Sequence, residues 1–280
     1  MTADTITSIG GSVVQHGPCN NRIYVIRLSP GDLPGILDRL DAMAREKGYA
    51  KIFAKVPASV RELFLARGYR TEACVPGFFS GREDGHFMAA YPDPARSRAD
   101  DAAIREVVAS ARSTAGERRL FAPPPGCRVD AAAPEDAPGI AALYREVFET
   151  YPFPIHDAGY IARTMEGHIR YFCIRGEGQI VAAASAEMDV RAENVEMTDF
   201  ATLPEFRGYG LSRLLLQRME ESMRDAGMQV AYTIARALSF PINRTFARAG
   251  YAYAGTLLNN TNICGSFESM NVWYKPLVHR

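Results

Sequence analysis

The sequence has little cysteine, and none of it is spaced to form a metal site. Its five cysteines are scattered, without a C-x-x-C pair: Cys19, Cys74, Cys127, Cys173 and Cys264. Disulfide-stabilised secreted domains usually carry an even set of cysteines, and zinc sites need closely spaced ones. We therefore expect reduced thiols in a cytoplasmic protein, and no metal.

The chain also lacks an excess of charge of either sign and any long apolar run. Lys plus Arg and Asp plus Glu both number 32, which argues against nucleic acid or an anionic membrane as partner. No apolar run approaches the roughly 20 residues that cross a bilayer, and the first residues lack the pattern of a secretion signal. A length of 280 residues favours two domains. The oligomeric state stays open, a homodimer included.

The clearest domain boundary is the run A-P-P-P-G at residues 122–126. Before it, strands at 21–28 and 51–56, a hairpin at 77–91 and helices at 31–47, 59–66 and 99–119 predict a small α/β domain over residues 1–122. No glycine turn after a bulged strand occurs there, and Glu83, Asp84 and His86 are typical of a solvated turn. We therefore expect the function to lie in the domain at 127–280.

That second domain is organised around residues 195–212, V-E-M-T-D-F-A-T-L-P-E-F-R-G-Y-G-L-S. Its apolar alternation slips by one residue at Asp199-Phe200, which predicts a β-bulge, and Pro204 ends the strand. A glycine turn then leads into a helix with an apolar face formed by Leu211, Leu214, Leu215 and Met219.

A strand, a glycine turn and a helix N-terminus together favour anion binding. The first-turn amides have no acceptor within the helix, and the helix dipole adds positive potential there. The turn lacks G-x-x-x-x-G-K-[ST] and G-x-G-x-x-G, which excludes a P-loop and argues against a dinucleotide-binding turn. A diphosphate of another kind is the remaining prediction.

The motif R-x-x-G-x-[GA] after a bulged strand resembles the acyl-CoA loop of the GNAT acetyltransferase superfamily. Arg207 and Gly210 match, whereas Ser212 stands where glycine or alanine is usual. From 127 on, the predicted order is strand, two helices, three strands, helix, strand, helix and two strands, as in a complete GNAT domain, an α/β fold with a mixed sheet. The resemblance implies acetyl-CoA binding by Phe200, Ala201, Thr202, Arg207, Gly208, Tyr209, Gly210, Leu211, Ser212, Asn243 and Phe246.

The second family motif brings two alternatives and one departure. Asn243 matches a polar contact to the pantetheine arm, but it could equally cap the helix after Pro241. Many members carry a proton-donating tyrosine where this chain has Phe246. Tyr251, with Tyr253 and Cys264 behind it, is then the candidate general acid.

Acetylation of an amine also needs a base, because a primary ammonium has a pKa near 10.4 and attacks only after losing its proton. Glu196, four residues before F-A-T, stands where several GNAT enzymes hold a glutamate base, and Asp199 is the second candidate. Both form part of the predicted catalytic set with Tyr251.

Most of the chain, including G-Y-A-K-I-F-A-K-V, E-M-T-D-F-A-T and the amide-rich tail, resembles the β-lysine N-acetyltransferase branch of the superfamily. The resemblance implies acetylation of the ε-amino group of β-lysine to give a compatible solute for osmotic stress. The expected substrate-binding residues are Tyr151, Phe153, Arg236, Asn260, Asn262 and Glu268. Another diamine, an amino acid or a protein lysine as substrate, and a non-catalytic acyl-CoA sensor, remain alternatives.

Two segments of the chain echo each other. G-Y-A-K-I-F-A-K-V from Gly48 and F-L-A-R-G-Y from Phe64 parallel G-M-Q-V-A-Y-T-I-A-R from Gly227 and F-A-R-A-G-Y from Phe246. Chance similarity of αβα units explains the echo equally simply. Our hypothesis is that the N-terminal domain is a smaller, degenerate half-copy of the GNAT fold.

Overall fold

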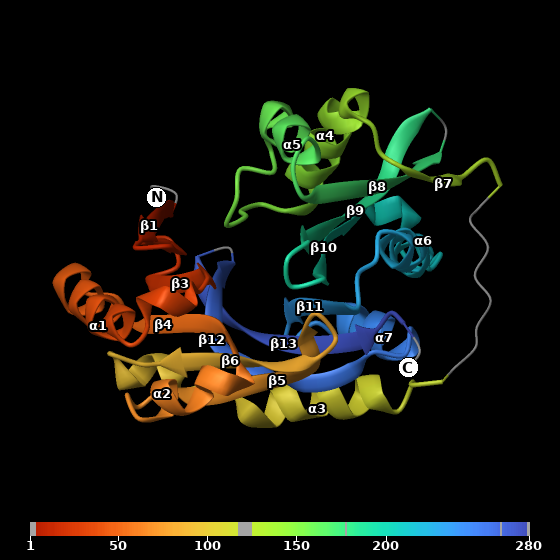
Figure 1. Cartoon of the computed structure of the whole chain (residues 1–280). Helices are drawn as coiled ribbons and strands as arrows, with labels where there is room; N and C mark the ends of the chain where they lie inside the picture. The colour runs from red at the N-terminus through yellow and green to blue at the C-terminus, as the bar shows by residue number, and fades with distance from the viewer. Residues whose placement is uncertain (1–3, 117–124, 177, 264, 279–280) are drawn as a thin grey trace.

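The computed structural model describes residues 4–116, 125–176, 178–263 and 265–278. Their strands form one continuous sheet in the order β1-β2-β3-β4-β6-β5-β12-β13-β11-β10-β9-β8-β7. The N-terminal half supplies the first six strands and the C-terminal half the other seven, so the two halves meet edge to edge (Figure 1). Most of the proline-rich run at 122–126 lies outside the described residues.

The N-terminal half contains the predicted strands and hairpin, and two strands that sequence analysis missed at its start. Its elements are β1 (Thr5–Ile9), β2 (Ser12–Gly17), β3 (Arg22–Arg27), α1 (Gly35–Lys47), β4 (Lys51–Pro57), α2 (Arg61–Leu65), β5 (Arg70–Phe79), β6 (Glu83–Ala90) and α3 (Asp101–Arg112). Gly48 ends α1 in the left-handed conformation, as predicted. α1 begins at Gly35 rather than Gly31, because a separate 3₁₀ turn at Pro30–Asp32 precedes it.

The C-terminal half has the predicted order of elements throughout. These are β7 (Arg128–Ala131), α4 (Ala137–Val147), α5 (Ala158–Met165), β8 (Ile169–Gly176), β9 (Gln179–Asp189), β10 (Asn194–Thr202), α6 (Leu211–Asp225), β11 (Val230–Arg236), α7 (Phe240–Arg248), β12 (Ala252–Ile263) and β13 (Ser266–Pro276). α4 and α5 cover one face of its strands and α6 covers the opposite face (Figure 1). The strand β10 is thus held between two helical layers.

The two halves share one strand order when each is followed outward from their common edge. In the C-terminal half the order is β12-β13-β11-β10-β9-β8-β7, and in the N-terminal half it is β5-β6-β4-β3-β2-β1. Each contains one parallel pair, β10 with β11 and β3 with β4, connected through one long helix. The strand order of the N-terminal half is therefore that of the C-terminal half without the last strand.

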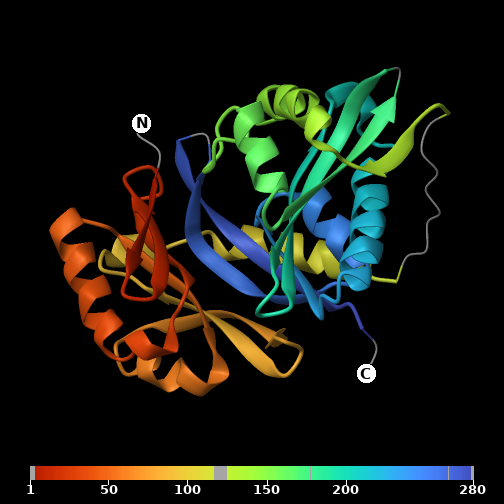
Figure 2. The ribbon, with the colours of Figure 1, turned by 45° about the horizontal axis from the view of Figure 1, so that its top comes forward.

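The joint between the halves is tight. Gly255 of β12 pairs with Ala73 of β5, and a Cβ at Gly255 would lie 2.1 Å from the Glu72 carbonyl oxygen. Beside it, the buried Lys51 ammonium donates to the Glu72 carboxylate and to the Leu258 carbonyl, both at 2.8 Å. The β12–β13 hairpin stands between the two halves (Figure 2).

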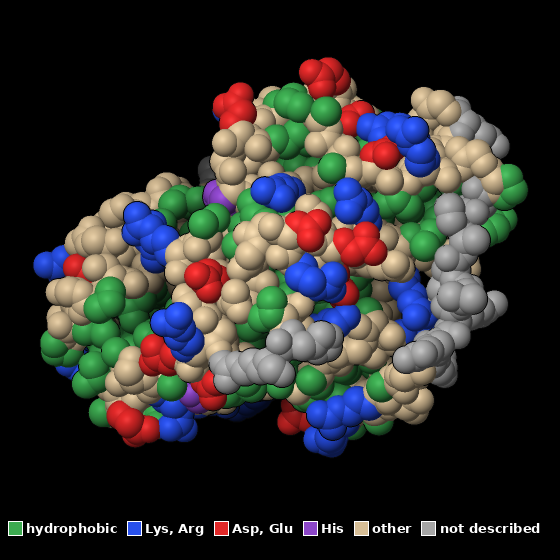
Figure 3. Space-filling view, turned by 45° about the vertical axis from the view of Figure 1, so that its right-hand side comes forward, with side chains coloured by type: hydrophobic (Ala, Val, Ile, Leu, Met, Phe, Trp, Pro, Cys, Tyr) green, Lys and Arg blue, Asp and Glu red, His purple; other side chains and the backbone are tan. Residues whose placement is uncertain are grey.

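Helix α3 belongs to the N-terminal stretch of sequence but packs on the C-terminal half. Ile104 and Val108 form a small apolar cluster with Ala237, and the Arg244 guanidinium of α7 donates to the Ser110 hydroxyl at 2.6 Å. On the face drawn in Figure 3, Lys and Arg side chains are interspersed with Asp and Glu. None of the described helices is long and apolar enough to cross a membrane.

Candidate active site

The predicted bulge is present at the expected residues of β10. Its register against β9 shifts between Thr198 and Ala201, and Asp199 takes the left-handed conformation with φ of 57°. This region of backbone space is strained for a residue with a side chain, so the surrounding contacts must hold it. The bulge redirects the carboxylate of Asp199 and the end of the strand.

Next to the bulge, β10 and β11 separate. The two strands pair only at residues 194–196 with 230–232, although β10 continues to Thr202 and β11 to Arg236. On its other edge β10 stays paired with β9, and β11 stays paired with β13. The backbone groups on the two facing edges therefore border an opening that starts beyond Glu196.

The glycine turn after β10 leads directly into α6. Gly208 and Gly210 have φ of 88° and 75°, a region that glycine adopts without strain, and α6 starts at Leu211. Within the described part of the chain, the backbone amides of residues 208–212 have no backbone acceptor. Five amides without a backbone acceptor thus lie at the positive end of a 15-residue helix.

Three side chains form a row across the strands at the mouth of this opening. Glu196 of β10 lies directly opposite Glu187 of β9 and opposite Tyr232 of β11. Cross-strand neighbours project from the same face of a sheet, so the two carboxyl groups face each other. Burial raises the pKa of Glu187 to about 8, and the charges of Glu196 and Asp199 add to this.

The carboxyl group of Asp199 is fully engaged by hydroxyl groups. The Tyr151 hydroxyl donates to Oδ1, and the Ser185 hydroxyl donates to Oδ2 at 2.5 Å. Burial raises the pKa of Asp199, and these hydroxyls act to lower it. The Glu196 carboxyl interacts with fewer hydroxyl groups, with that of Tyr232 as its hydrogen-bond partner, so we favour Glu196 as the candidate base.

The N-terminal half supplies cations to this row, although sequence analysis expected no site there. The Lys55 ammonium of β4 donates to the Tyr232 hydroxyl at 2.9 Å and lies 5.4 Å from the centre of the Tyr24 ring. Burial raises the pKa of Glu196, whereas Lys55, the Tyr232 hydroxyl and Arg22 act to lower it. The site thus lies where the two halves meet.

Asn243 and Phe246 occupy the core beside the opening. The Asn243 amide donates to the carbonyls of Arg236 and Ser239, and its oxygen accepts from Asn271 and Trp273. It holds α7 against β11 and β13, and the residue at the cap position is Ser239. The capping alternative for Asn243 is therefore wrong.

A chain of ring contacts joins the bulge to α7. Phe246 stands edge-on to Phe200 of the bulge at 5.5 Å and to Tyr251 at 5.0 Å between ring centres. Burial raises the pKa of Tyr251 well above its usual value, and the Glu220 carboxyl of α6 adds to the shift. The candidate acid Tyr251 thus approaches the bulge only through Phe246. Tyr253 contacts Trp273, and Cys264 lies outside the described residues.

The predicted substrate residues at the end of the chain mainly contact protein. Arg236 and Glu268 form a two-bonded ion pair at 2.6 and 2.7 Å, so each neutralises the other. The Asn262 amide donates to the Cys19 carbonyl at 2.7 Å, and the Asn260 carbonyl accepts from the buried Arg22 guanidinium. This amide-rich hairpin fastens the N-terminal half beside the active site. Phe153 packs against the core near Tyr151.

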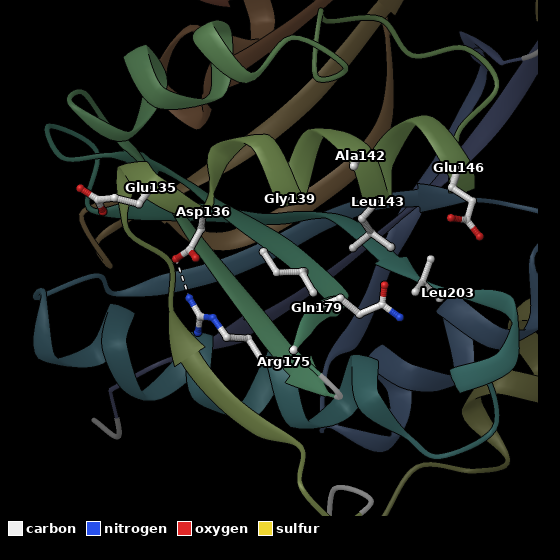
Figure 4. Close-up of a pocket in the computed structure, with 11 residues that line it drawn as sticks. Glu135, Asp136, Gly139, Ala142, Leu143, Glu146, Arg175, Gln179 and Leu203 are labelled. Atoms are coloured by element: carbon white, nitrogen blue, oxygen red, sulfur yellow. Dashed lines mark hydrogen bonds and ion pairs between the residues drawn. The ribbon is translucent and has the colours of Figure 1, made fainter.

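Two pockets lie away from the carboxylate row. One, of about 410 Å³, opens between α4 and the β8–β9 turn, where Asp136 is paired with Arg175 (Figure 4). The other, of about 370 Å³, lies between the two halves and includes Arg27, Asp189 and Arg191. Neither lining includes Glu187, Glu196 or Asp199. We therefore place the chemistry at the β10–β11 opening.

Comparison with known proteins identifies the family of this chain. A family model described as the acetyltransferase (GNAT) family matches residues 140–251, which include β10, the glycine turn and α7. The chain is 40% identical over 272 residues to "Beta-lysine N(6)-acetyltransferase" of Methanococcus maripaludis, covering 97% of this chain and 98% of that protein. The chain belongs to the GNAT acetyltransferase family.

Two further relatives of this acetyltransferase match along most of their length. "Beta-lysine N(6)-acetyltransferase" of Methanosarcina mazei is 31% identical over 268 residues, covering 88% of this chain and 98% of that protein. "N-acetyltransferase YodP" of Bacillus subtilis is 31% identical over 271 residues, covering 95% of this chain and 96% of that protein. The similarity therefore includes the N-terminal half as well as the GNAT domain.

Several residues of the site escaped sequence analysis. Glu187 is the one carboxylate in the largely apolar run I-V-A-A-A-S-A-E-M. Lys55 lies four residues after Lys51, so both lysines project from the same face of the largely apolar strand β4. A charge within a buried strand requires a partner, and that signal could have marked both. The partners themselves come from segments far apart in the sequence.

Proposed function

We propose that this acetyltransferase transfers the acetyl group of acetyl-CoA to the ε-amino group of β-lysine. The observation that carries the proposal is the similarity, over 97% of the chain, to a protein of that name. The chemistry of the site supports it. A substrate with two ammonium groups suits a site with three carboxyl groups, Glu187, Glu196 and Asp199.

The acyl donor fits the β10–β11 opening. The unpaired amides of residues 208–212 suit a diphosphate, and a Cβ at Gly208 would meet no atom within 4 Å, so the turn is open to a ligand. Arg207 lies at the same turn, with its Nε 3.4 Å from the Thr202 carbonyl. We assign the pantetheine arm to the facing backbone edges at 200–202, with Phe200 and Phe246 as its apolar floor.

For the chemistry we propose direct attack. Glu196, through a water or directly, takes a proton from the ε-ammonium, and the freed amine nitrogen attacks the thioester carbonyl carbon. A C–N bond forms, the C–S bond breaks with its electron pair on sulfur, and the nitrogen of the new amide gives up its second proton to solvent. Backbone amides at the bulge stabilise the oxyanion. Thiols have a pKa near 8.5, so the thiolate can depart without the tyrosine that Phe246 replaces; Tyr251 remains the secondary candidate for its protonation.

The product would be Nε-acetyl-β-lysine, which has lost one positive charge and is a net-neutral zwitterion. Such a molecule can accumulate without counterions, so we propose a role as a compatible solute under osmotic stress, made in the cytoplasm.

We also propose that the N-terminal half is a degenerate copy of the GNAT fold. Its strand order, its single parallel pair and its two connecting helices correspond to those of the C-terminal half. It lacks the glycine turn, so we assign it a role in completing the substrate site rather than in binding acetyl-CoA.

One assay tests the proposed function. Release of free thiol from acetyl-CoA is followed with β-lysine, α-lysine and polyamines side by side, and the product is identified by mass spectrometry. We expect the highest kcat/KM with β-lysine. A higher value with another amine would reassign the substrate. Tight acetyl-CoA binding without turnover on any amine would favour an acyl-CoA sensor instead, in keeping with Phe246.

A further inference from the structure

Buried polar atoms without partners lie where the N-terminal half meets strand β12 of the C-terminal half. Within the described residues, Arg22 Nε and the Asn260 side-chain oxygen have no hydrogen-bond partner. Both residues are deeply buried, with 6% and 2% of their surface exposed. Buried polar groups are nearly always paired, so a neighbouring donor and acceptor left open together indicate a ligand that supplies the opposite groups.

These two residues are already in contact with each other. The Arg22 guanidinium donates through Nη1 to the Asn260 backbone carbonyl and lies 3.4 Å from the Thr261 hydroxyl. The bond orients the guanidinium without using Nε. Asn260 lies on the β12 bulge between Leu257 and Thr261, which is the segment that separates the two halves. An unpaired cationic donor and an unpaired amide oxygen thus come from opposite halves of the chain.

Electrostatics connects this pair to the catalytic row. Glu196 is among the groups that act on the charge of Arg22, and Arg22 in turn acts on Glu196. Lys55 is a weaker candidate for binding a ligand. Its ammonium donates to the Tyr232 hydroxyl and lies near the Tyr24 and Tyr232 rings.

Arg22 and Arg96 each retain one unpaired guanidinium nitrogen, Nε and Nη1 respectively, among the described residues. Of the two, Arg22 stands over the Tyr24 ring that Lys55 also contacts, whereas Arg96 stands over Phe267.

We propose that Arg22 and Asn260 form the subsite for the amino-acid end of the substrate. Arg22 Nε receives the carboxylate, and the Asn260 side-chain oxygen accepts from the β-ammonium, while the ε-amino group lies at Glu196. In β-lysine the carboxyl carbon and the β-nitrogen are three bonds apart, and Arg22 already contacts the Asn260 backbone, so one amino-acid end can reach both residues. This inference rests on the proposed function and assigns specificity to the N-terminal half.

The test compares β-lysine with its carboxamide, 3,6-diaminohexanamide, which keeps both amines and loses the carboxylate charge. For Arg22→Gln we expect kcat/KM for β-lysine to fall roughly 10- to 100-fold, mainly through KM, because a charge-assisted hydrogen bond is lost. The value for the carboxamide should change less than about threefold, and Arg22→Lys should recover part of the loss.

A matched control is Arg96→Gln, since Arg96 is equally buried at the same joint and donates to the carbonyls of Asn259 and Asn20. It should lower the melting temperature without changing the preference for β-lysine. The acetyl-CoA dissociation constant, measured for every variant, shows that the fold is intact.

The outcomes separate the two claims. A wild-type enzyme that acetylates neither compound refutes the proposed function. A wild-type enzyme that prefers β-lysine, together with an Arg22→Gln variant that loses activity on both compounds equally or on neither, refutes the subsite alone.

Discussion

The two halves of the molecule have the same strand order and different chemistry. In the C-terminal half, the helix after the parallel strand starts from a turn with two glycines in the left-handed region and open amides. In the N-terminal half, the equivalent connection contains Asp32, whose carboxylate accepts from the Gly11 amide and the Ser12 hydroxyl. The hydrogen bond from Ser12 lowers the pKa of Asp32, which keeps a negative charge at that turn.

The difference shows that the fold alone does not make the acetyl-CoA site. A diphosphate is attracted by the amides of residues 208–212 and would be repelled by Asp32. The N-terminal half contributes instead through its face, with Arg22, Tyr24 and Lys55 beside the carboxylates of its neighbour. Four predictions test this division of labour.

The largest effect is expected at the base. Glu196→Gln should lower kcat by about 10²- to 10⁴-fold, because the amide cannot take the proton of the ammonium. The dissociation constant of acetyl-CoA, measured by calorimetry, should stay within about twofold, because the diphosphate turn is untouched. Near-normal turnover would remove Glu196 from the mechanism and make Asp199 the candidate.

The next prediction compares the glycine turn before α6 with the start of α1. Gly210→Val should weaken acetyl-CoA binding roughly 10-fold or more, because a β-branched residue is strained at a φ of 75°. Gly35→Ala at the start of α1 is the matched change in the other half, where a Cβ meets no atom within 4 Å. It should leave the dissociation constant unchanged. Equal losses in both variants would mean that the N-terminal half also takes part in binding acetyl-CoA.

The joint between the halves should determine stability. Lys51→Met removes one partner of a buried ion pair and leaves Glu72 without its ammonium, at a cost of about 3–5 kcal/mol in the free energy of unfolding. Urea titration measures this value. The exposed pair of Arg67 and Asp38 serves as control, and Arg67→Met should barely change stability. A small loss for Lys51→Met would show that the halves do not depend on this contact.

The last effect concerns pH. Burial raises the pKa of Glu187 to about 8, from about 4.3 in an unfolded chain. The folded protein therefore holds this proton more tightly, and the resulting stability is present below about pH 4.3 and is lost as the pH rises through about 8.

Glu187→Gln abolishes this titration. Its stability relative to wild type should therefore rise between about pH 5 and about pH 9, as measured by urea unfolding across that range. A pH-independent difference between the two proteins would show that the carboxyl of Glu187 is ionised throughout.

Much of the C-terminal half was predictable because its signals are local. The slip at Asp199-Phe200 predicted the bulge, and Gly208 and Gly210 marked a turn that needs positive φ. The order of elements from residue 128 on was also correct. In the N-terminal half, β1 and β2 were missed, and α3 ends at Arg112 rather than extending to 119, with residues 117–124 outside the described part.

The substrate residues were less predictable, because polarity in a loop does not say what it binds. Arg236 and Glu268 were expected to hold opposite ends of the substrate, yet they bind each other. Asn262 donates to the Cys19 carbonyl of the N-terminal half. Tyr151 donates its hydroxyl to Asp199 at the bulge, and its contact with substrate stays a prediction.

The sequence by itself determined the strand at 195–202, its bulge, the glycine turn and the helix behind it, since each depends on residues within a few positions of one another. Only the tertiary structure decided that Glu187, Tyr232, Lys55 and Arg22 surround Glu196. Those neighbours lie on four strands and on both halves of the chain. Their proximity follows from strand register and from the joint at Gly255, which no local pattern encodes.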